Sequence, residues 1–328
     1  MAGREAHPGL VRHWGAIAAA VICCARMAQL PRIPLRPGRL FVFGLGYTAT
    51  VLARRLKGQG WIVGGTVQSE DKRAALTAEG IQAAIFEGTR PMEDFAAVAG
   101  RATHILSSVP PVGGSDPVVA LHADDIAGLK SVKWVGYLST TGVYGDTGGD
   151  WVDERAGLHP TGPRGRARVD AERAWLDLGR LGLPVHVFRL AGIYGPGRSA
   201  LDQLRAGTAR RVVKPGQVFS RIHVEDIAAV LMASMAEPNP GAVYNVCDDE
   251  PAPPQDVIAY AAALLGIAAP PEIPYDEAAK SMSAMARSFY DDNRKVANRR
   301  IKDELGVKLA YPDYRAGLKA LLTASPAR

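Results

Sequence analysis

Two glycines and an alanine follow a short apolar run, with the spacing Gly44-x-Gly46-x-x-Ala49. Gly44 allows a tight turn, Gly46 leaves room for a ligand to approach the backbone, and Ala49 permits close helix–strand packing. An amphipathic stretch follows, whose positive end would point its amides at a phosphate. We therefore expect Gly44, Gly46, Tyr47, Thr48 and Ala49 to bind the diphosphate of a dinucleotide, an ordinary glycine turn being the alternative.

The residues after the second apolar run bear on which dinucleotide binds. In NAD-binding sites an acidic residue at this point binds the ribose hydroxyls. Here the run ends in the neutral Gln68 and Ser69, and the cations Lys72 and Arg73 follow two acids. A neutral tip with nearby cations suits a 2′-phosphate, so we predict NADP in preference to NAD. A solvated helix face is the alternative reading of Lys72 and Arg73.

Hydroxyl groups follow two further apolar runs. Ser107, Ser108 and Val109 end one of them, where backbone commonly passes the adenosine half of a dinucleotide. The next run ends as Tyr137-Leu-Ser-Thr-Thr-Gly-Val-Tyr-Gly145, and hydroxyls at such an end point into the ligand crevice of a parallel sheet. We expect Thr140 to contact the reacting atoms.

Three later segments complete the set of motifs. They are Arg164-Gly-Arg-Ala-Arg168 before a helix, Phe188-Arg-Leu-Ala-Gly-Ile-Tyr-Gly-Pro-Gly-Arg198, and Arg221-Ile-His-Val-Glu-Asp-Ile-Ala228. In this order, with the glycine loop, they resemble the extended short-chain dehydrogenase/reductase superfamily, the epimerase/dehydratase-like branch. The resemblance covers about residues 40–322. It implies a Rossmann core, a nicotinamide cofactor and a C-terminal lobe that closes over the substrate.

The chain departs from this family at its catalytic pair, Tyr-x-x-x-Lys. Arg164 and Arg168 hold the two positions, and an arginine stays protonated, so Arg164 cannot shuttle a proton as a phenol does. The two guanidinium groups lie one helical turn apart and could together hold a carboxylate, phosphate or enolate oxygen. Tyr144 is the candidate substitute acid/base, a wall residue of the pocket being the preferred alternative.

The resemblance also implies substrate-side residues in the second half of the chain. We expect Tyr194, Arg198, Arg221 and His223 to line the substrate pocket, although a structural hydrogen-bonding role is the alternative for His223. The basic stretch 293–300 could reach an anionic substrate, and a solvated helix face is the preferred alternative.

These motifs need a framework of alternating strands and helices. Apolar runs at 40–43, 61–67, 83–86, 104–107, 134–139 and 185–190 predict buried parallel strands, and amphipathic stretches between them predict helices. The fold class is therefore α/β: a Rossmann-type doubly wound parallel sheet with a smaller C-terminal α-rich substrate lobe. After residue 191 we expect helices at 224–235, 254–265, 276–287 and 311–322, with a strand at 243–246 returning to the main sheet.

The resulting domain boundaries are a leader at 1–38, a NAD(P)-binding core at 39–190 and a substrate-side lobe at 191–328. Residues 15–25 are apolar but too short to span a bilayer. We rank a disordered or spurious leader first, an export signal second and a membrane anchor last.

Charge and cysteine content narrow the partners. The net charge is +6, of which residues 1–39 contribute +5, so the rest of the chain is nearly balanced and no nucleic-acid partner is expected. Three cysteines without metal-ligand spacing favour reduced thiols, no metal and a cytoplasmic location. Analogy with relatives suggests a homodimer. We predict an NAD(P)-dependent oxidoreductase or epimerase/dehydratase acting on a small polar molecule, the alternative being a non-catalytic NADP(H)-binding sensor or scaffold.

Overall fold

The computed structural model describes residues 35–324. Three expectations for residues 1–34, a disordered leader, an export signal and an anchor, lie outside the described residues. Within the described part, no helix is both long and apolar enough to cross a membrane.

Seven strands form one sheet in the order β11-β7-β5-β4-β1-β2-β3, and every neighbouring pair is parallel. They are β1 (Arg39–Phe43), β2 (Ile62–Val67), β3 (Gln82–Ile85), β4 (His104–Ser107), β5 (Trp134–Thr140), β7 (Val185–Leu190) and β11 (Val243–Val246). The order reverses between β1 and β4, and this switch point is where doubly wound sheets bind ligands. The predicted Rossmann-type sheet, including the return strand 243–246, is confirmed.

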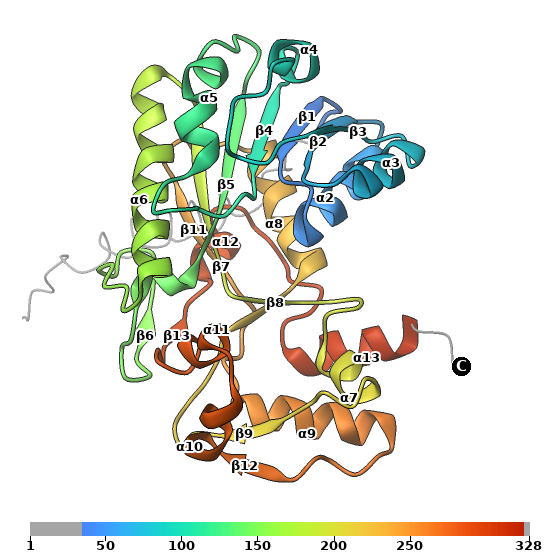
Figure 1. The fold of residues 1–328 in the computed structure, drawn as a ribbon, viewed down its shortest axis with the longest axis vertical. Helices are drawn as coiled ribbons and strands as arrows, with labels where there is room; N and C mark the ends of the chain where they lie inside the picture. The colour runs from blue at the N-terminus through green and yellow to red at the C-terminus, as the bar shows by residue number, and fades with distance from the viewer. Residues whose placement is uncertain (1–34, 325–328) are drawn as a thin grey trace, which may run out of the picture. The chain divides into compact units, whose positions relative to one another are not determined.

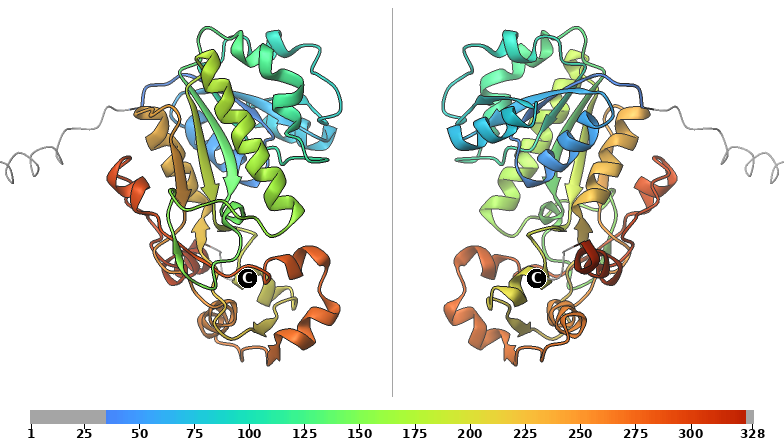
Figure 2. Two further views of the ribbon diagram at one scale, coloured as in Figure 1. Left: turned by 90° about the vertical axis from the view of Figure 1, so that its left-hand side faces the viewer. Right: turned by 90° about the vertical axis from the view of Figure 1, so that its right-hand side faces the viewer.

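Helices cover both faces of this sheet (Figure 1). They are α2 (Tyr47–Lys57), α3 (Glu70–Ala78), α4 (Phe95–Ala99), α5 (Pro117–Ala127), α6 (Pro163–Asp177) and α8 (Val224–Ala236). In Figure 2, α6 and α8 lie on opposite sides of the strands. Successive side chains of a strand point to opposite faces of the sheet, so each face has its own core. Phe41, Phe43 and Tyr137 pack with Trp175 of α6 in one core, whereas Val42 packs in the other.

Shorter elements build the smaller lobe and its connections. They are β6 (Trp151–Val152), β8 (Gly192–Tyr194), α7 (Ala200–Arg205), β9 (Arg211–Val213), β10 (Arg221–His223), α9 (Pro254–Leu265), β12 (Glu272–Pro274), α10 (Tyr275–Ala278), α11 (Ala284–Ser288), β13 (Lys295–Val296), α12 (Arg299–Asp303) and α13 (Tyr314–Ala324), with 3₁₀ turns η1 (Thr141–Tyr144), η2 (Leu178–Leu181) and η3 (Ala279–Ser281). A third core, which includes Leu201, Val257 and Leu318, joins α7, α9 and α13. The α-rich lobe expected from the sequence is therefore present.

The helix predicted at 276–287 is wrong. Met282 is extended, with ψ of 144°, and separates η3 from α11. Ser283 then begins the next helix, because its hydroxyl accepts a hydrogen bond from the Ala286 amide at 3.1 Å. The N-cap signal of this serine outweighs the apolar periodicity that favoured one continuous helix.

Candidate functional site

The glycine loop lies between the ends of β2 and β4. The Gly44 amide donates to Thr66 Oγ1 at 2.8 Å, and the Ser108 hydroxyl donates to the Gly44 carbonyl. Gly44 has a φ of +82°, and a Cβ there would lie 3.1 Å from Val109 Cγ2. Both the left-handed backbone and the close approach of Val109 therefore require glycine. The loop is held firmly at the carboxyl edge of the sheet.

Helix α2 begins directly after this loop without a side-chain cap. Its N-cap is Gly46, and no side chain bonds the amides of the first turn. Helices α3, α6 and α9 also begin without a side-chain cap, whereas Asp116 caps α5 by accepting from the amides of Val118 and Val119 at 2.9 and 3.0 Å. Uncapped amides at the positive end of a helix suit an anion. The first turn of α2, which holds Tyr47, Thr48 and Ala49, therefore has no side-chain cap, and diphosphate binding there stays a prediction.

Tyr47 reaches from the glycine loop to the turn after β8. Its hydroxyl donates to the Pro196 carbonyl at 3.1 Å, and the exposed Arg198 guanidinium lies 5.8 Å from its ring centre. Burial raises the pKa of the Tyr47 phenol, so it remains a neutral donor. The expected cofactor residue Tyr47 and the expected substrate residue Arg198 are therefore brought together.

The other cofactor candidates lie at the ends of β2 and β4. Gln68, Ser69 and Lys72 are exposed, while the neighbouring Arg73 pairs with Glu70 at 2.6 Å. Ser107 is fully buried, and its hydroxyl has no hydrogen-bond partner in the described part of the chain. Buried polar groups are normally satisfied. Ser107 lies opposite Phe43, the last residue of β1. An unsatisfied hydroxyl at this position is consistent with a polar ligand at the carboxyl edge of the sheet.

Thr140 ends β5 and is half-buried. Its Oγ1 accepts a hydrogen bond from the Gly142 amide at 3.1 Å, which fixes the hydroxyl at the start of η1. The preceding Ser139 instead faces α6, where its hydroxyl donates to Glu172 Oε1. Of the hydroxyls in this segment, the fixed, half-buried Thr140 suits contact with a ligand.

Arg164 and Arg168 lie in different environments. Arg164 is exposed in the first turn of α6. Arg168 is half-buried, and its Nη1 donates to the Leu138 carbonyl at 2.7 Å and to the Tyr137 hydroxyl at 3.1 Å. The structure therefore fixes one nitrogen of Arg168 against β5 and leaves Arg164 exposed, and the joint binding of one substrate anion by both arginines stays a prediction.

Tyr144 lies in η1, directly after the carboxyl end of β5, and its hydroxyl is taken up by protein partners. It is 1% exposed, its hydroxyl donates to Asn245 Oδ1 at 2.7 Å, and it accepts from Arg189 Nη1 at 2.9 Å. Arg189 in turn forms a buried ion pair with Glu172 at 2.8 Å. Burial raises the pKa of Tyr144 to about 12. These contacts argue against its predicted acid/base role and make it part of a network that joins β5, β7 and β11.

Of the expected substrate residues on β8 and β10, Tyr194 and His223 are buried and Arg221 is half-buried. His223 is 2% exposed, its Nδ1 accepts from the Glu225 amide at 3.3 Å, and burial lowers its pKa to about 4. This N-cap contact favours the structural alternative for His223. Arg221 Nη1 donates to the carbonyls of Phe219 and Ala252 at 2.8 and 2.9 Å. Tyr194 packs edge-on against His223, with 5.1 Å between ring centres.

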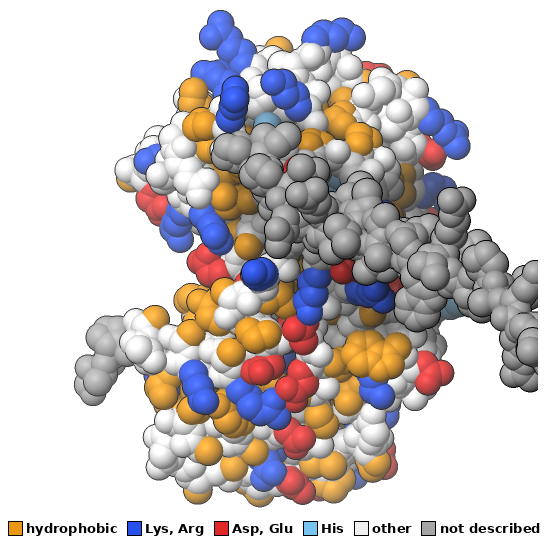
Figure 3. All heavy atoms as spheres, turned by 180° about the vertical axis from the view of Figure 1, so that it is seen from behind, with side chains coloured by type: hydrophobic (Ala, Val, Ile, Leu, Met, Phe, Trp, Pro, Cys, Tyr) orange, Lys and Arg blue, Asp and Glu red, His pale blue; other side chains and the backbone are white. Residues whose placement is uncertain are grey.

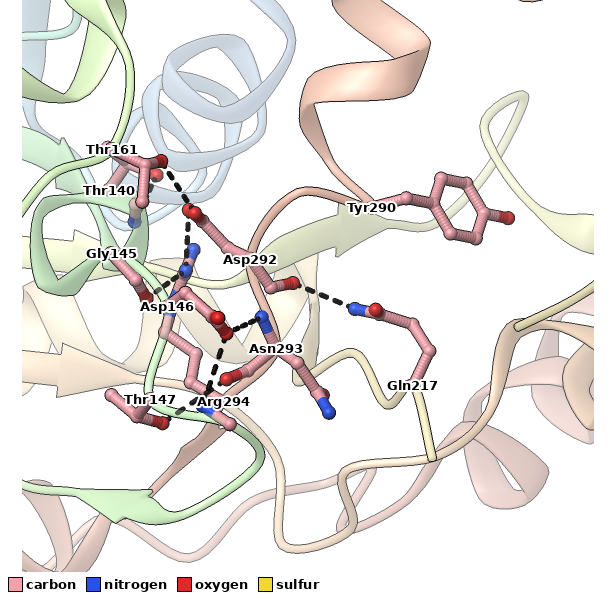
Figure 4. Close-up of polar contacts among 12 residues, drawn as sticks. Thr140, Gly145, Asp146, Thr147, Thr161, Gln217, Tyr290, Asp292, Asn293 and Arg294 are labelled. Atoms are coloured by element: carbon pink, nitrogen blue, oxygen red, sulfur yellow. Dashed lines mark hydrogen bonds and ion pairs between the residues drawn. The ribbon is translucent and has the colours of Figure 1, made fainter. Parts of the chain in front are cut away.

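A cluster around Arg294, from the basic stretch 293–300, lies beside Thr140 (Figure 4). Arg294 Nη1 donates to the Gly145 carbonyl at 2.7 Å and pairs with Asp292 at 2.8 Å. Asp292 accepts from the Thr161 hydroxyl at 2.6 Å. For Arg294 the preferred reading of stretch 293–300 as a solvated face is wrong, since its side chain is 16% exposed, whereas Arg299 is 88% exposed and fits it.

We searched residues 35–324 for side chains that could bind a metal ion. No group of three or more His, Cys, Asp or Glu side chains there could hold an ion. Cys247, the cysteine of that range, is buried and reduced.

The parallel sheet, the glycine loop before α2 and the order of the later motifs place this chain in the extended short-chain dehydrogenase/reductase superfamily, an oxidoreductase-type enzyme family. It is 54% identical to a conserved protein of unknown function from Silicibacter pomeroyi DSS, with 88% of this chain and 100% of that chain covered and a TM-score of 0.81. A "putative NAD-dependent epimerase/dehydratase" from Methylobacillus flagellatus is 26% identical, with 88% and 99% covered and a TM-score of 0.66.

Two curated proteins are also similar. Protein YeeZ of Escherichia coli K12 is 27% identical over 285 residues, 84% of this chain and 97% of its own. The 3-diazoavenalumate denitrifying reductase of a Streptomyces species is 30% identical over 161 residues, 47% of this chain and 51% of its own.

The UDP-glucuronic acid 4-epimerase of Bacillus cereus, solved with NAD, shares the fold at 16% identity and a TM-score of 0.71, with 87% of this chain and 96% of that chain covered. No protein-family model matches the chain.

Proposed function

We propose that the protein is an NAD(P)-dependent enzyme of the oxidoreductase or epimerase/dehydratase type, acting on a small polar substrate. The observation that carries this proposal is the uncapped amino end of α2, directly after a glycine loop fixed by Thr66 and Ser108. Such an end binds a diphosphate through its amides and its dipole. The NAD complex of the Bacillus cereus epimerase supports the choice of ligand.

The residues present fit the dinucleotide along the carboxyl edge. The first-turn amides of α2 would hold the diphosphate, Ser108 and Val109 would flank the adenosine half, and Thr140 would lie at the reacting end. When bound, the nicotinamide supplies or accepts a hydride. The protein's own part is to hold the reacting oxygen of the substrate at the Thr140 hydroxyl.

The proton for such a reaction needs another source than the family's tyrosine. Arg164 cannot deprotonate, and the Tyr144 hydroxyl is engaged by Asn245 and Arg189. We therefore propose that water beside Thr140 carries the proton. An activity without a phenolic acid should lack the titration of a tyrosine in its pH–rate profile.

Substitutions at Gly46 test dinucleotide binding. An added Cβ at this position comes no nearer than 4.0 Å to other atoms, and its φ of −74° suits any residue. Gly46→Asp would cap α2 and keep or raise the melting temperature, while its charge repels a diphosphate. NADPH affinity measured by calorimetry should fall at least about tenfold in Gly46→Asp. Gly46→Ala places a methyl group in the room that Gly46 leaves for the ligand, so this neutral variant separates the steric loss from the added loss due to charge. An affinity of Gly46→Asp equal to that of the wild type would reject the proposal.

The proposed preference for NADP over NAD depends on the residues that directly follow β2. Gln68 and Ser69 carry no charge there, and the exposed Lys72 is available to a 2′-phosphate. Lys72→Glu should weaken NADPH binding and leave NADH binding nearly unchanged. A parallel loss for both cofactors would reject the assignment of Lys72.

A sensor or scaffold remains the second candidate function, because arginines replace the catalytic pair. Hydride transfer from NADPH to a panel of sugar nucleotides, aldehydes and keto acids separates the two. Turnover of any of them supports the enzyme, whereas tight cofactor binding without turnover supports the sensor. We also propose a homodimer in the cytoplasm, which light scattering and cell fractionation test.

A further inference from the structure

We propose that Arg294, on the segment before β13, holds an oxyanion of the substrate beside Thr140. This inference rests on the proposed function and specifies its substrate class, a small molecule with a carboxylate or phosphate group.

The side chains of Thr140 and Arg294 both lie next to Gly142. A Cβ built on Gly142 would lie 3.4 Å from Thr140 Oγ1 and 3.9 Å from Arg294 Nη2. The φ of Gly142 does not fall in the left-handed region. Glycine therefore leaves room for a methyl-sized group that the threonine hydroxyl and the guanidinium both border.

The hydrogen bonds of Arg294 orient its remaining donors toward this space. Nη1 is taken up by the Gly145 carbonyl and by Asp292 Oδ2. Neither Nη2 nor Nε forms a hydrogen bond with another of residues 35–324, and Nη2 is the nitrogen next to Gly142. An arginine fork whose one branch is fixed presents the other for recognition of an oxyanion.

The support of Arg294 is unusually complete for a connecting segment. The Asn293 amide donates to Asp146 Oδ1 at 2.8 Å, and its Nδ2 donates to the Gly216 carbonyl at 2.9 Å. Its carbonyl accepts from the amides of Thr147 and Gly149 at 3.1 and 2.9 Å. These contacts tie the segment to two other parts of the chain, so the guanidinium needs little ordering when a ligand binds.

The degree of burial suits a binding role. The side chains of Arg294 and Asp292 are 16% and 12% exposed, so their pair is screened less than a surface pair yet remains reachable. Thr161, directly before α6, holds Asp292 at 2.6 Å and so positions the arginine indirectly.

Arg294→Gln is the test, with Arg299→Gln as its control. Both changes remove one arginine, and Arg299 is an exposed residue that pairs with Asp303 on its own helix. Malonate and inorganic phosphate are titrated by calorimetry into each variant, with and without NADPH. We expect binding of one probe by the wild type, at least about tenfold weaker binding in Arg294→Gln, and unchanged binding in the control. The probe that binds tells a carboxylate from a phosphate substrate.

The conservative variant separates binding from folding. Arg294→Lys keeps the charge but loses the fork, so its affinity should lie between those of wild type and Arg294→Gln. A thermal melt of each variant must match the wild type; if Arg294→Gln melts early, Arg294→Lys and Thr161→Val take its place. Binding of neither probe at millimolar concentration, or equal binding in Arg294 and Arg299 variants, overturns the inference. Loss of dinucleotide binding in Gly46→Asp is scored separately, so the two proposals fail independently.

Discussion

Arg168 donates from Nη1 to the carbonyl oxygen of Leu138 at 2.7 Å. Leu138 lies two residues before Thr140 on β5, so this bond fastens α6 to the strand that carries the candidate site. The Arg168 guanidinium also lies 5.8 Å from the ring centre of Tyr137, whose pKa is raised by burial. The arginine at the position of the family's lysine therefore braces the strand edge.

The two arginines of α6 should respond differently to mutation. Arg168→Ala removes two hydrogen bonds to β5 and should lower the unfolding free energy by about 1–3 kcal/mol. Arg164→Ala changes an exposed residue and should leave stability within about 0.5 kcal/mol. Urea unfolding measures both. If kcat/KM is also unchanged in Arg164→Ala, Arg164 has no role in the site.

Tyr47 should slow the release of the dinucleotide, because it links the glycine loop to the turn at Pro196. Tyr47→Phe removes that hydrogen bond, so we expect NADPH to dissociate severalfold faster in stopped-flow displacement. The unfolding free energy should change by less than about 1 kcal/mol. Tyr260→Phe, which removes a phenol from α9, is the control. Equal dissociation rates in the two variants would exclude the link.

The main sheet could be predicted from the sequence because six of its seven strands carry enough apolar residues to be largely buried, the edge strand β3 being the exception. The runs at 104–107, 185–190 and 243–246 match β4, β7 and β11 residue for residue. Strands such as β8 and β10 have only three residues each, and their pairing arises from tertiary contacts that no local pattern encodes.

The site could be predicted only in part, for the same reason. The glycine loop is a local motif, and its chemistry depends on residues close together in the chain. Arg294 meets Gly145 across 149 residues, and Tyr144 meets Asn245 across 101. Neither contact leaves a spacing signal, so the sequence pattern favours a surface position for Arg294 and offers Tyr144 as an acid/base candidate.

Gly317 of α13 lies so close to Tyr194 of β8 that replacing this glycine with alanine should destabilise the protein. A Cβ on Gly317 would lie 2.0 Å from the Tyr194 hydroxyl oxygen. Gly→Ala in a helix ordinarily stabilises by up to about 1 kcal/mol, but here overpacking should destabilise by about 1–3 kcal/mol. Gly179→Ala is the control, since nothing lies within 4 Å of that Cβ. A higher melting temperature for Gly317→Ala would contradict this packing.

Asp248 should make stability fall as pH rises. It is 1% exposed, its Oδ2 has no hydrogen-bond partner among residues 35–324, and burial, partly offset by the Arg221 charge, raises its pKa from 3.8 to about 8. Between these two values the folded state binds more protons than the unfolded state, so the contribution of this group to stability decreases with pH, by at most about 1.4 kcal/mol per unit.

The variant Asp248→Asn isolates this contribution. Buried His104, His186 and His223, whose pKa values are lowered to about 4, act in the opposite direction below pH 6.5 and cancel in the comparison with wild type. Urea unfolding of both proteins from pH 5 to 8 should give a stability difference that increasingly favours Asp248→Asn as pH rises. A difference that stays constant across this range would mean that the carboxyl of Asp248 is already ionised in the folded protein at pH 5.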